Sequence, residues 1–249
     1  MAKGRHVLRL LGASLIGVTM ALGLFCQASV MVRAQTAVDL ALVLAVDVSG
    51  SIDQTRFELQ KQGYAAAFRN PRVVGAIRSG ASQAIAVTMF QWTGPELQVQ
   101  VVPWTLIGSQ AAANGFAAAV DGTPRQLFAG GTSISGAIDY GVRLLDDAPF
   151  RGTRRVIDVS GDGSNNRGRH VHLARDEAVA AGICINGLPI LALEPHLDRY
   201  YYDSVIGGAG AFVVAAENYE TFADAVLKKL ITEIAGLPGA FTPAAGRQP

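Results

Sequence analysis

The chain is poor in cysteine, histidine and charged residues. Its 249 residues include two cysteines and four histidines, and Asp, Glu, Lys and Arg together make up 16%. Such a low charged fraction, beside 50% hydrophobic residues, argues against intrinsic disorder and allows one large core. The length suits one domain with a leader, or at most two small domains.

The chain also lacks a basic signature for nucleic acid. The formal net charge is +1, but four basic residues precede residue 35, where no acidic residue is found. The remainder holds 17 basic and 20 acidic residues, a net charge of −3. A mildly acidic body has no electrostatic footprint for the phosphate backbone, so we expect no nucleic-acid partner.

The first 34 residues are typical of an export signal. Three basic residues lie within the first nine, an uncharged and mostly apolar run covers 10–25, and Val32-Arg33-Ala34 is a small-residue cleavage site. We predict a signal peptide over 1–34 and a periplasmic or secreted protein. The alternative is an uncleaved membrane anchor, because the uncharged stretch is long enough to span a bilayer. After cleavage only Cys184 remains, which excludes an internal disulfide.

From Val38 onward, apolar runs of strand character alternate with segments of helical period. We expect strands over 38–46, 83–92, 98–104, 154–160, 183–192 and 211–216. We expect helices over 53–69, 109–120, 133–145, 169–181, 197–206 and 219–235, the first of them stopped by Asn70-Pro71.

This alternation predicts an α/β fold. We expect a Rossmann-like three-layer sandwich, with a mostly parallel central sheet and helices on both faces. The short turn between 83–92 and 98–104 predicts one antiparallel edge strand. One domain should cover 35–236, followed by a tail over 237–249 that is rich in Gly, Pro and Ala.

Oxygen-bearing side chains gather in three loops at strand ends. One loop follows the first strand, a second leads into the helix over 133–145, and a third follows the strand over 154–160. Ligands in such sheets bind beyond the carboxyl ends of the strands, and alternate residues of an extended loop point the same way. We therefore predict one site made of Asp47, Ser49, Ser51, Thr132 and Asp162.

Two carboxylates and three hydroxyls suit a small, hard divalent cation. Mg²⁺ or Mn²⁺ fits such oxygen ligands, and Ca²⁺ fits them less well. The three loops contain no His or Cys, which disfavours zinc. Hydroxyls are weak neutral donors, so the ion stays electron-poor and its open position can take a carboxylate from a protein partner.

Two further polar residues are expected to support the site rather than to ligate. Asp158 lies inside the strand over 154–160, and we expect it to be a buried acceptor of hydrogen bonds from loop groups. Asn165 follows Asp162 in the third loop. We expect Asn165 to shape the turn and to orient the ligands without binding the metal itself.

The three loops together resemble the metal-ion-dependent adhesion site of von Willebrand factor A domains. The resemblance rests on Asp-x-Ser-x-Ser at 47–51, Gly-Gly-Thr at 130–132 and Asp-Gly at 162–163, and it covers roughly 38–235. The segments 156–163, 185–188 and 205–213 resemble, more narrowly, a bacterial subgroup of these domains with no assigned function.

The resemblance implies a central sheet with helices on both faces and Mg²⁺ or Mn²⁺ at its top. It implies that the hydroxyls of Ser49, Ser51 and Thr132 ligate the ion directly. By the same resemblance, Asp47 and Asp162 hold the ion directly or through water.

These observations predict an exported, non-catalytic module that binds a protein partner through the metal. One alternative is a metal-dependent hydrolase or phosphotransferase. A phosphotransferase with an aspartate nucleophile commonly has a second acid two residues later, where this chain has Ser49. A subtilisin-like hydrolase needs a histidine before its serine, where this chain has only His6, and Gly-x-Ser-x-Gly is absent. The other alternative is a metal-free scaffold or envelope assembly factor.

Overall fold

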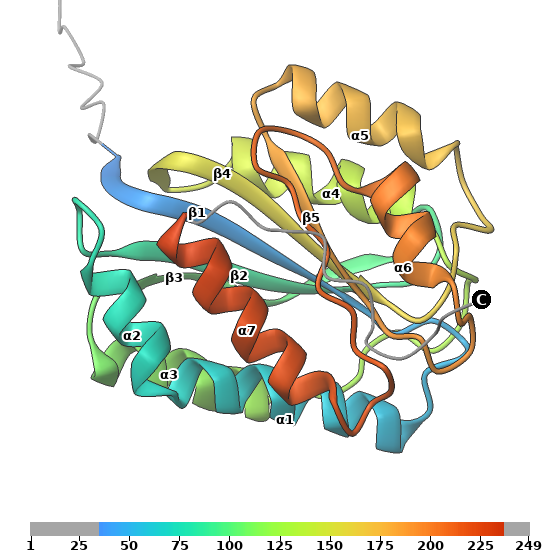
Figure 1. Ribbon diagram of the computed structural model, residues 1–249, viewed down its shortest axis with the longest axis horizontal. Helices are drawn as coiled ribbons and strands as arrows, with labels where there is room; N and C mark the ends of the chain where they lie inside the picture. The colour runs from blue at the N-terminus through green and yellow to red at the C-terminus, as the bar shows by residue number, and fades with distance from the viewer. Residues whose placement is uncertain (1–34, 237–249) are drawn as a thin grey trace, which may run out of the picture. The chain divides into compact units, whose positions relative to one another are not determined.

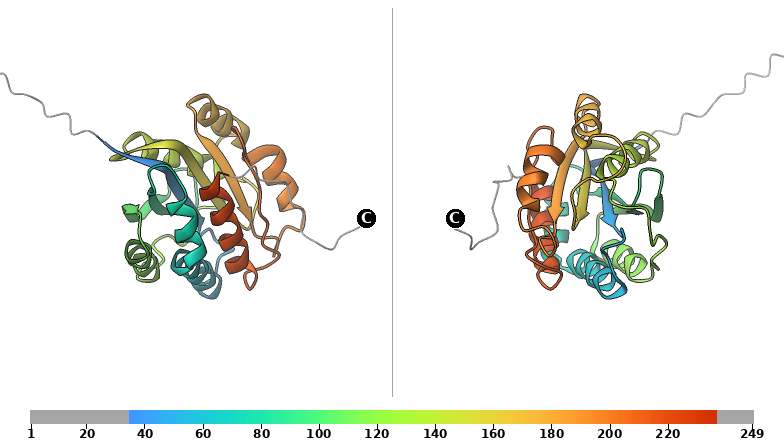
Figure 2. Two further views of the ribbon diagram at one scale, coloured as in Figure 1. Left: turned by 60° about the vertical axis from the view of Figure 1, so that its left-hand side comes forward. Right: turned by 90° about the vertical axis from the view of Figure 1, so that its right-hand side faces the viewer.

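The computed structural model describes residues 35–236. The predicted signal peptide over 1–34 and the predicted tail over 237–249 lie outside the described residues. Within 35–236 a five-stranded sheet lies between two layers of helices (Figures 1 and 2). The predicted three-layer α/β sandwich is therefore confirmed.

The sheet has the strand order β3-β2-β1-β4-β5. Its strands are β1 (Thr36–Asp47), β2 (Ile85–Trp92), β3 (Gln98–Ile107), β4 (Phe150–Gly161) and β5 (Cys184–Pro189). β3 pairs antiparallel with β2, and the other three pairings are parallel. The five residues between β2 and β3 are too few for a crossover, so they form a hairpin at the edge, as the sequence predicts.

β1 occupies the centre of the sheet because it is apolar on both faces. Leu40, Leu42 and Leu44 belong to one core cluster, and Ala41 and Val43 belong to the other. This alternation follows from the period of two along a strand. A continuous apolar run is the expected composition of a strand that helices cover on both sides.

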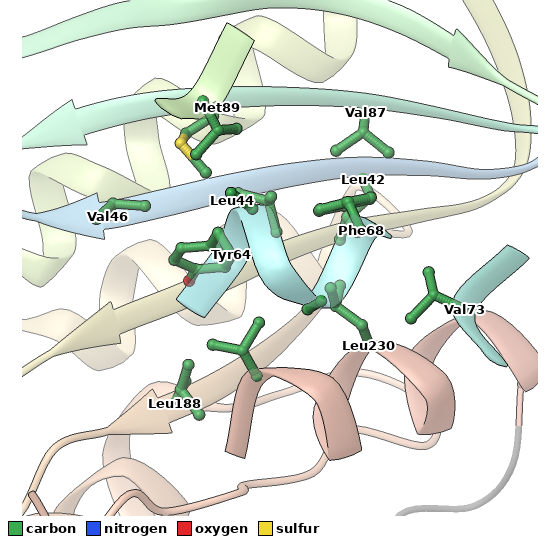
Figure 3. Packing of buried hydrophobic residues seen from close by; sticks show 14 of the residues in the cluster. Leu42, Leu44, Val46, Tyr64, Phe68, Val73, Val87, Met89, Leu188 and Leu230 are labelled. Carbon is green, nitrogen blue, oxygen red and sulfur yellow. The ribbon is translucent and has the colours of Figure 1, made fainter. Parts of the chain in front are cut away.

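The helices divide between the two faces (Figure 1). One face carries α1 (Gln54–Arg69), α2 (Pro71–Arg78), α3 (Gln110–Asp121) and α7 (Phe222–Ala235). The other carries α4 (Ile134–Asp146), α5 (Val171–Ala180) and α6 (Leu197–Tyr200), which continues as one π-helical turn over Tyr201–Val205. Leu42, Phe68 and Leu230 pack together on the first face (Figure 3). Across residues 35–236, none of these helices has both the length and the apolar character needed to cross a bilayer.

The structure differs from the sequence-based prediction of the elements in two main places. The first helix ends before Asn70-Pro71, as predicted, but a further helix, α2, begins at Pro71. The Asn70 side chain accepts a hydrogen bond from the backbone N–H of Arg72 at 2.9 Å, and proline suits the first helical position.

The segment over 211–216 was predicted as a strand, but it forms only isolated bridges, from Val213 to Gly187 of β5 and from Ala216 to Ile190 just after β5. The backbone N–H of Phe212 donates to Oδ1 of Asn186 at 2.8 Å. Because the Asn186 side chain accepts this N–H, the N–H is not available to a backbone carbonyl of β5, and the ladder of backbone hydrogen bonds is interrupted there.

Candidate metal centre

The strand order reverses beside β1. The chain adds β2 and β3 on one side of β1 and then crosses to add β4 and β5 on the other. In open α/β sheets, ligands bind at such a switch point, outside the carboxyl ends of the strands. Val46 of β1 is in register with Ser160 of β4. Asp47 and Asp162 therefore leave the sheet next to each other.

The predicted ligands from the first and third loops are in contact. The hydroxyl oxygens of Ser49 and Ser51 lie 3.2 Å apart. Ser51 Oγ donates to Oδ1 of Asp162 at 2.6 Å, and the backbone N–H of Ser49 donates to Oδ1 of Asp47 at 2.7 Å. A chain of oxygen atoms therefore links the ends of β1 and β4.

Thr132, in the second loop, lies beside the residue that follows Asp162. Its Oγ1 lies 3.7 Å from the position that a Cβ atom would occupy on Gly163, the residue after Asp162. The backbone N–H of Asn166 donates to the Thr132 carbonyl at 2.9 Å, and Oδ1 of Asn166 accepts from the Thr132 N–H at 3.0 Å. The third loop therefore holds Thr132 by both of its backbone groups, next to the residue that follows Asp162.

The two carboxylates of this cluster are buried, with 0% of Asp47 and 1% of Asp162 exposed. Burial, and next the negative charge of Asp162, raise the pKa of Asp47 to about 7. Oδ2 of Asp47 has no hydrogen-bond partner among residues 35–236. Two buried carboxylates side by side are unfavourable unless a positive charge compensates them.

The donor set fits a hard divalent cation. It offers two carboxylates, one of them with the unpaired Oδ2 of Asp47, and three hydroxyls. No group of three or more His, Cys, Asp or Glu side chains that could hold a metal occurs within residues 35–236, so this centre depends on hydroxyl donors. Mg²⁺ accepts oxygen ligands with few carboxylates and keeps several waters, whereas zinc favours nitrogen and sulfur.

Two residues that the sequence did not single out contact Asp162. The Tyr219 hydroxyl donates to Oδ2 of Asp162 at 2.8 Å. Arg56 Nη1 lies 3.9 Å from the same oxygen and donates to the Ser51 carbonyl at 2.6 Å. The Arg56 guanidinium also lies 5.3 Å from the centre of the Tyr219 ring. Tyr219 and Asp162 are 57 residues apart in the chain, so no local spacing reveals their contact.

A second tyrosine lies beside Asp47. A Cβ atom on Gly161 would lie 2.9 Å from both the Tyr201 hydroxyl and Oδ2 of Asp47. Burial raises the pKa of Tyr201, and the charge of Asp47 adds to this. The hydroxyl has no hydrogen-bond partner in the described part of the chain. The missing side chain at Gly161 therefore leaves room for two unpaired buried oxygens to face one region.

Asp158 does not accept the expected hydrogen bonds from loop groups. Its Oδ1 instead lies 2.6 Å from Nζ of Lys229, and both side chains are buried. The reason is the packing of α7 on this face of β4, which brings a lysine against the carboxylate.

Asn165 joins the third loop to neighbouring segments. Its Oδ1 accepts from the Ser135 N–H at 3.0 Å, and its Nδ2 donates to the Arg169 carbonyl at 3.2 Å. It is the next residue, Asn166, that contacts a predicted ligand.

Comparison with known proteins places this architecture in a family. Residues 37–238 match the family described as "Protein of unknown function (DUF1194)". The chain belongs to this family. No curated protein matches the chain.

Solved structures share the fold of this family member. Proximal thread matrix protein 1 from the mussel byssus, "with zinc occupied MIDAS motif", is 12% identical with a TM-score of 0.57, over 81% of this chain and 49% of that one. A von Willebrand factor type A protein from Catenulispora acidiphila is 18% identical with a TM-score of 0.53, over 80% and 43%. The pilus adhesin SpaC from Lactobacillus rhamnosus GG is 14% identical with a TM-score of 0.54, over 82% and 31%.

The chain therefore has the von Willebrand factor A fold. It spans about half or less of the length of each of these three proteins. At identities below 20%, the likeness concerns the fold alone.

Proposed function

We propose that the chain is a non-catalytic binding module that holds one divalent cation, Mg²⁺ or Mn²⁺. The proposed ligands are Asp47, Ser49, Ser51, Thr132 and Asp162. The observation that carries this proposal is the pair of buried carboxylates at the switch point, bridged by serine hydroxyls, with Oδ2 of Asp47 unpaired among residues 35–236. A cation among these oxygens would offset the repulsion that raises the pKa of Asp47.

The cation would be the element that engages a protein partner. Three of the five proposed ligands are neutral hydroxyls, which are weak donors, so the ion would retain affinity for another anionic oxygen. We propose that an Asp or Glu carboxylate of the partner completes its coordination shell. The zinc-occupied MIDAS motif of the mussel byssus protein supports metal binding at this place in the fold.

Melting measurements with and without Mg²⁺ test the metal site. Ligand that binds only the folded state adds about 2.7 kcal/mol at a hundredfold excess over Kd, so the wild type should melt several degrees higher in saturating Mg²⁺. Thr132→Ala should lose this response, and Thr105→Ala on the edge strand β3 should keep it. A wild-type melting temperature that does not change with Mg²⁺ or Mn²⁺ would contradict the metal site and favour a metal-free scaffold.

The absence of catalysis is a separate part of the proposal. The Ser51 hydroxyl donates a hydrogen bond to the buried carboxylate of Asp162. We assign this carboxylate to the metal and not to general-base catalysis, so Ser51 is not an activated nucleophile. Phosphoester and peptide substrates should therefore show no Mg²⁺-dependent turnover. Turnover that requires Mg²⁺ and disappears in Thr132→Ala would establish a metal-dependent hydrolase.

We also propose that the domain is exported and released by cleavage after Ala34. Gln35, the residue after the proposed cleavage site, is already tied to the domain, since its Nε2 donates to the Ala148 carbonyl at 2.8 Å. The intact mass of the protein recovered from cell envelope or medium tests this proposal. A chain that begins at Gln35 is expected, and a membrane-bound chain of full mass would show an uncleaved anchor.

A further inference from the structure

Exposed apolar side chains gather near the proposed metal centre. Residues 35–236 include six large hydrophobic side chains that are exposed: Leu97, Leu106, Phe128, Leu173, Leu193 and Tyr202. Phe128 is the most exposed of them, at 65%. It lies in the loop that leads to Thr132, and Leu97 lies in the turn between β2 and β3, at the same end of the sheet. Exposed apolar groups that cluster in this way mark interaction sites more often than scattered ones do.

The loops that carry Leu97 and Phe128 are joined side by side. The Thr93 hydroxyl donates to the Ala129 carbonyl at 2.7 Å. A Cβ atom on Gly130 would lie 2.6 Å from Cδ1 of Leu97, and Gly130 has a φ of +125°, so both space and backbone require glycine there. Leu97 therefore lies against Gly130, two residues after Phe128 and two residues before Thr132.

Arg125 links the loop that carries Phe128 to the loop after β1, which carries Ser49 and Ser51. One of its nitrogens, Nη2, donates to the carbonyls of Val48 and Ser49 at 2.9 and 3.1 Å. Its guanidinium carbon lies 5.0 Å from the centre of the Phe128 ring, a cation–π contact. Arg125 therefore positions an exposed aromatic ring relative to a proposed metal ligand.

Three arginines also lie at this end of the sheet, beside the buried carboxylates of the centre. Arg56 and Arg125 contact the loop after β1. The Arg167 side chain lies over Gly131, because its Cγ is 2.6 Å from the position that a Cβ atom would occupy on Gly131. Glu194 brings an acidic group to the other side of the centre, near Gly163, where the Ser164 N–H donates to it at 2.9 Å. Arg125 and Arg167, which lie beside the loop of Phe128, can pair with acidic groups of a partner.

We propose that Phe128 and Leu97 form the apolar half of a partner-binding surface whose polar half is the metal centre. The occupant is a protein segment that places an Asp or Glu carboxylate on the cation and an apolar side chain, close in sequence, against Phe128. This inference rests on the proposed function. Arg125 is a positioning residue in this arrangement, because it contacts both the Phe128 ring and the loop after β1.

Selection from a random peptide library displayed on phage tests the surface. The immobilised protein is loaded with Mg²⁺, and bound phage are eluted with chelator. Peptides with an Asp or Glu and an apolar residue within about two positions should be enriched. The same selection is carried out on Phe128→Ser, and on Leu106→Ser as the matched control. Leu106 is exposed on β3 but lies at the opposite end of the sheet, in register with Ala86 near the start of β2.

A synthetic peptide of the enriched sequence gives the quantitative readout. It should bind Phe128→Ser about tenfold more weakly than the wild type, which corresponds to about 1.4 kcal/mol, and should bind Leu106→Ser as tightly as the wild type. A Mg²⁺ titration of each variant reports whether its metal centre is loaded.

The outcomes separate the two proposals. Enrichment of acidic peptides without an apolar neighbour, or equal peptide affinity in Phe128→Ser and the wild type, would overturn the apolar surface and leave metal-dependent binding intact. Selection that yields no acidic peptides releasable by chelator would overturn the proposed function, and this inference with it.

Discussion

The Tyr219 hydroxyl donates a 2.8 Å hydrogen bond to Oδ2 of Asp162, and Ser51 donates to the other oxygen of the same carboxylate. Both oxygens of Asp162 are therefore held by hydroxyl groups. Tyr219 lies three residues before α7, so the entry to the last helix fixes the orientation of a proposed metal ligand. Groups that orient a ligand in this way tune metal affinity without touching the metal.

Tyr219→Phe should weaken Mg²⁺ binding with little effect on the fold. The ring keeps its packing, but Asp162 loses a donor that orients it, and the loss of such a contact typically costs about tenfold to a hundredfold in metal affinity. Isothermal titration with Mg²⁺ or Mn²⁺ measures the change. Tyr140→Phe is the matched control, because Tyr140 lies in α4 and its ring packs on Phe90 of β2, away from Asp162. Equal Kd values for the wild type and Tyr219→Phe would exclude this role.

Asp47→Asn should stabilise the protein in chelator and destabilise it relative to the wild type in Mg²⁺. Without metal at pH 8, the folded state must keep a buried carboxylate ionised beside Asp162. The rise of the Asp47 pKa from 3.8 to about 7 corresponds to at most about 4 kcal/mol, which asparagine avoids. Because this pKa is raised, the penalty grows as the pH rises through about 4 to 7, and the advantage of asparagine should vanish at pH 4.

Urea denaturation in chelator at pH 8 and pH 4, and in Mg²⁺ at pH 8, measures this reversal. A variant that is less stable than the wild type in chelator at pH 8 would show that the two carboxylates do not repel each other as the geometry indicates.

Lys229→Met should be strongly destabilising. The Nζ–Oδ1 distance to Asp158 is 2.6 Å, and Lys229 is 0% and Asp158 1% exposed. Removal of one partner leaves a buried charge uncompensated, which costs about 3–5 kcal/mol. The double variant Lys229→Met with Asp158→Leu should recover much of this loss in urea denaturation. A double variant as unstable as Lys229→Met alone would mean that the lost stability is due to packing and not to the unpaired carboxylate.

The fold was accessible from the sequence because its determinants are local. The apolar run over 38–46 predicts a strand buried on both faces, and the short turn before Gln98 predicts the antiparallel edge. The contact between the loop after β1 and the loop after β4 could also be predicted, since strand ends in a parallel sheet meet at one edge.

Other features depend on tertiary contacts and leave no local pattern. Asp158 is paired with a lysine 71 positions later, because α7 packs across β4. The segment over 211–216 has strand composition, but the Asn186 side chain takes the Phe212 N–H that a ladder would need. Tyr219 and Arg56 reach Asp162 only once α1 and α7 are packed side by side.

Diffraction from crystals of residues 35–236 soaked in Mn²⁺, recorded near the manganese absorption edge, tests the central claim most directly. We predict one anomalous peak between the ends of β1 and β4, at about 2.1 Å from the hydroxyl oxygens of Ser49 and Ser51. The peak should be absent in Thr132→Ala crystals soaked at the same concentration. A wild-type crystal without manganese at this place, or with manganese only elsewhere, would contradict the assignment of these residues as a metal centre.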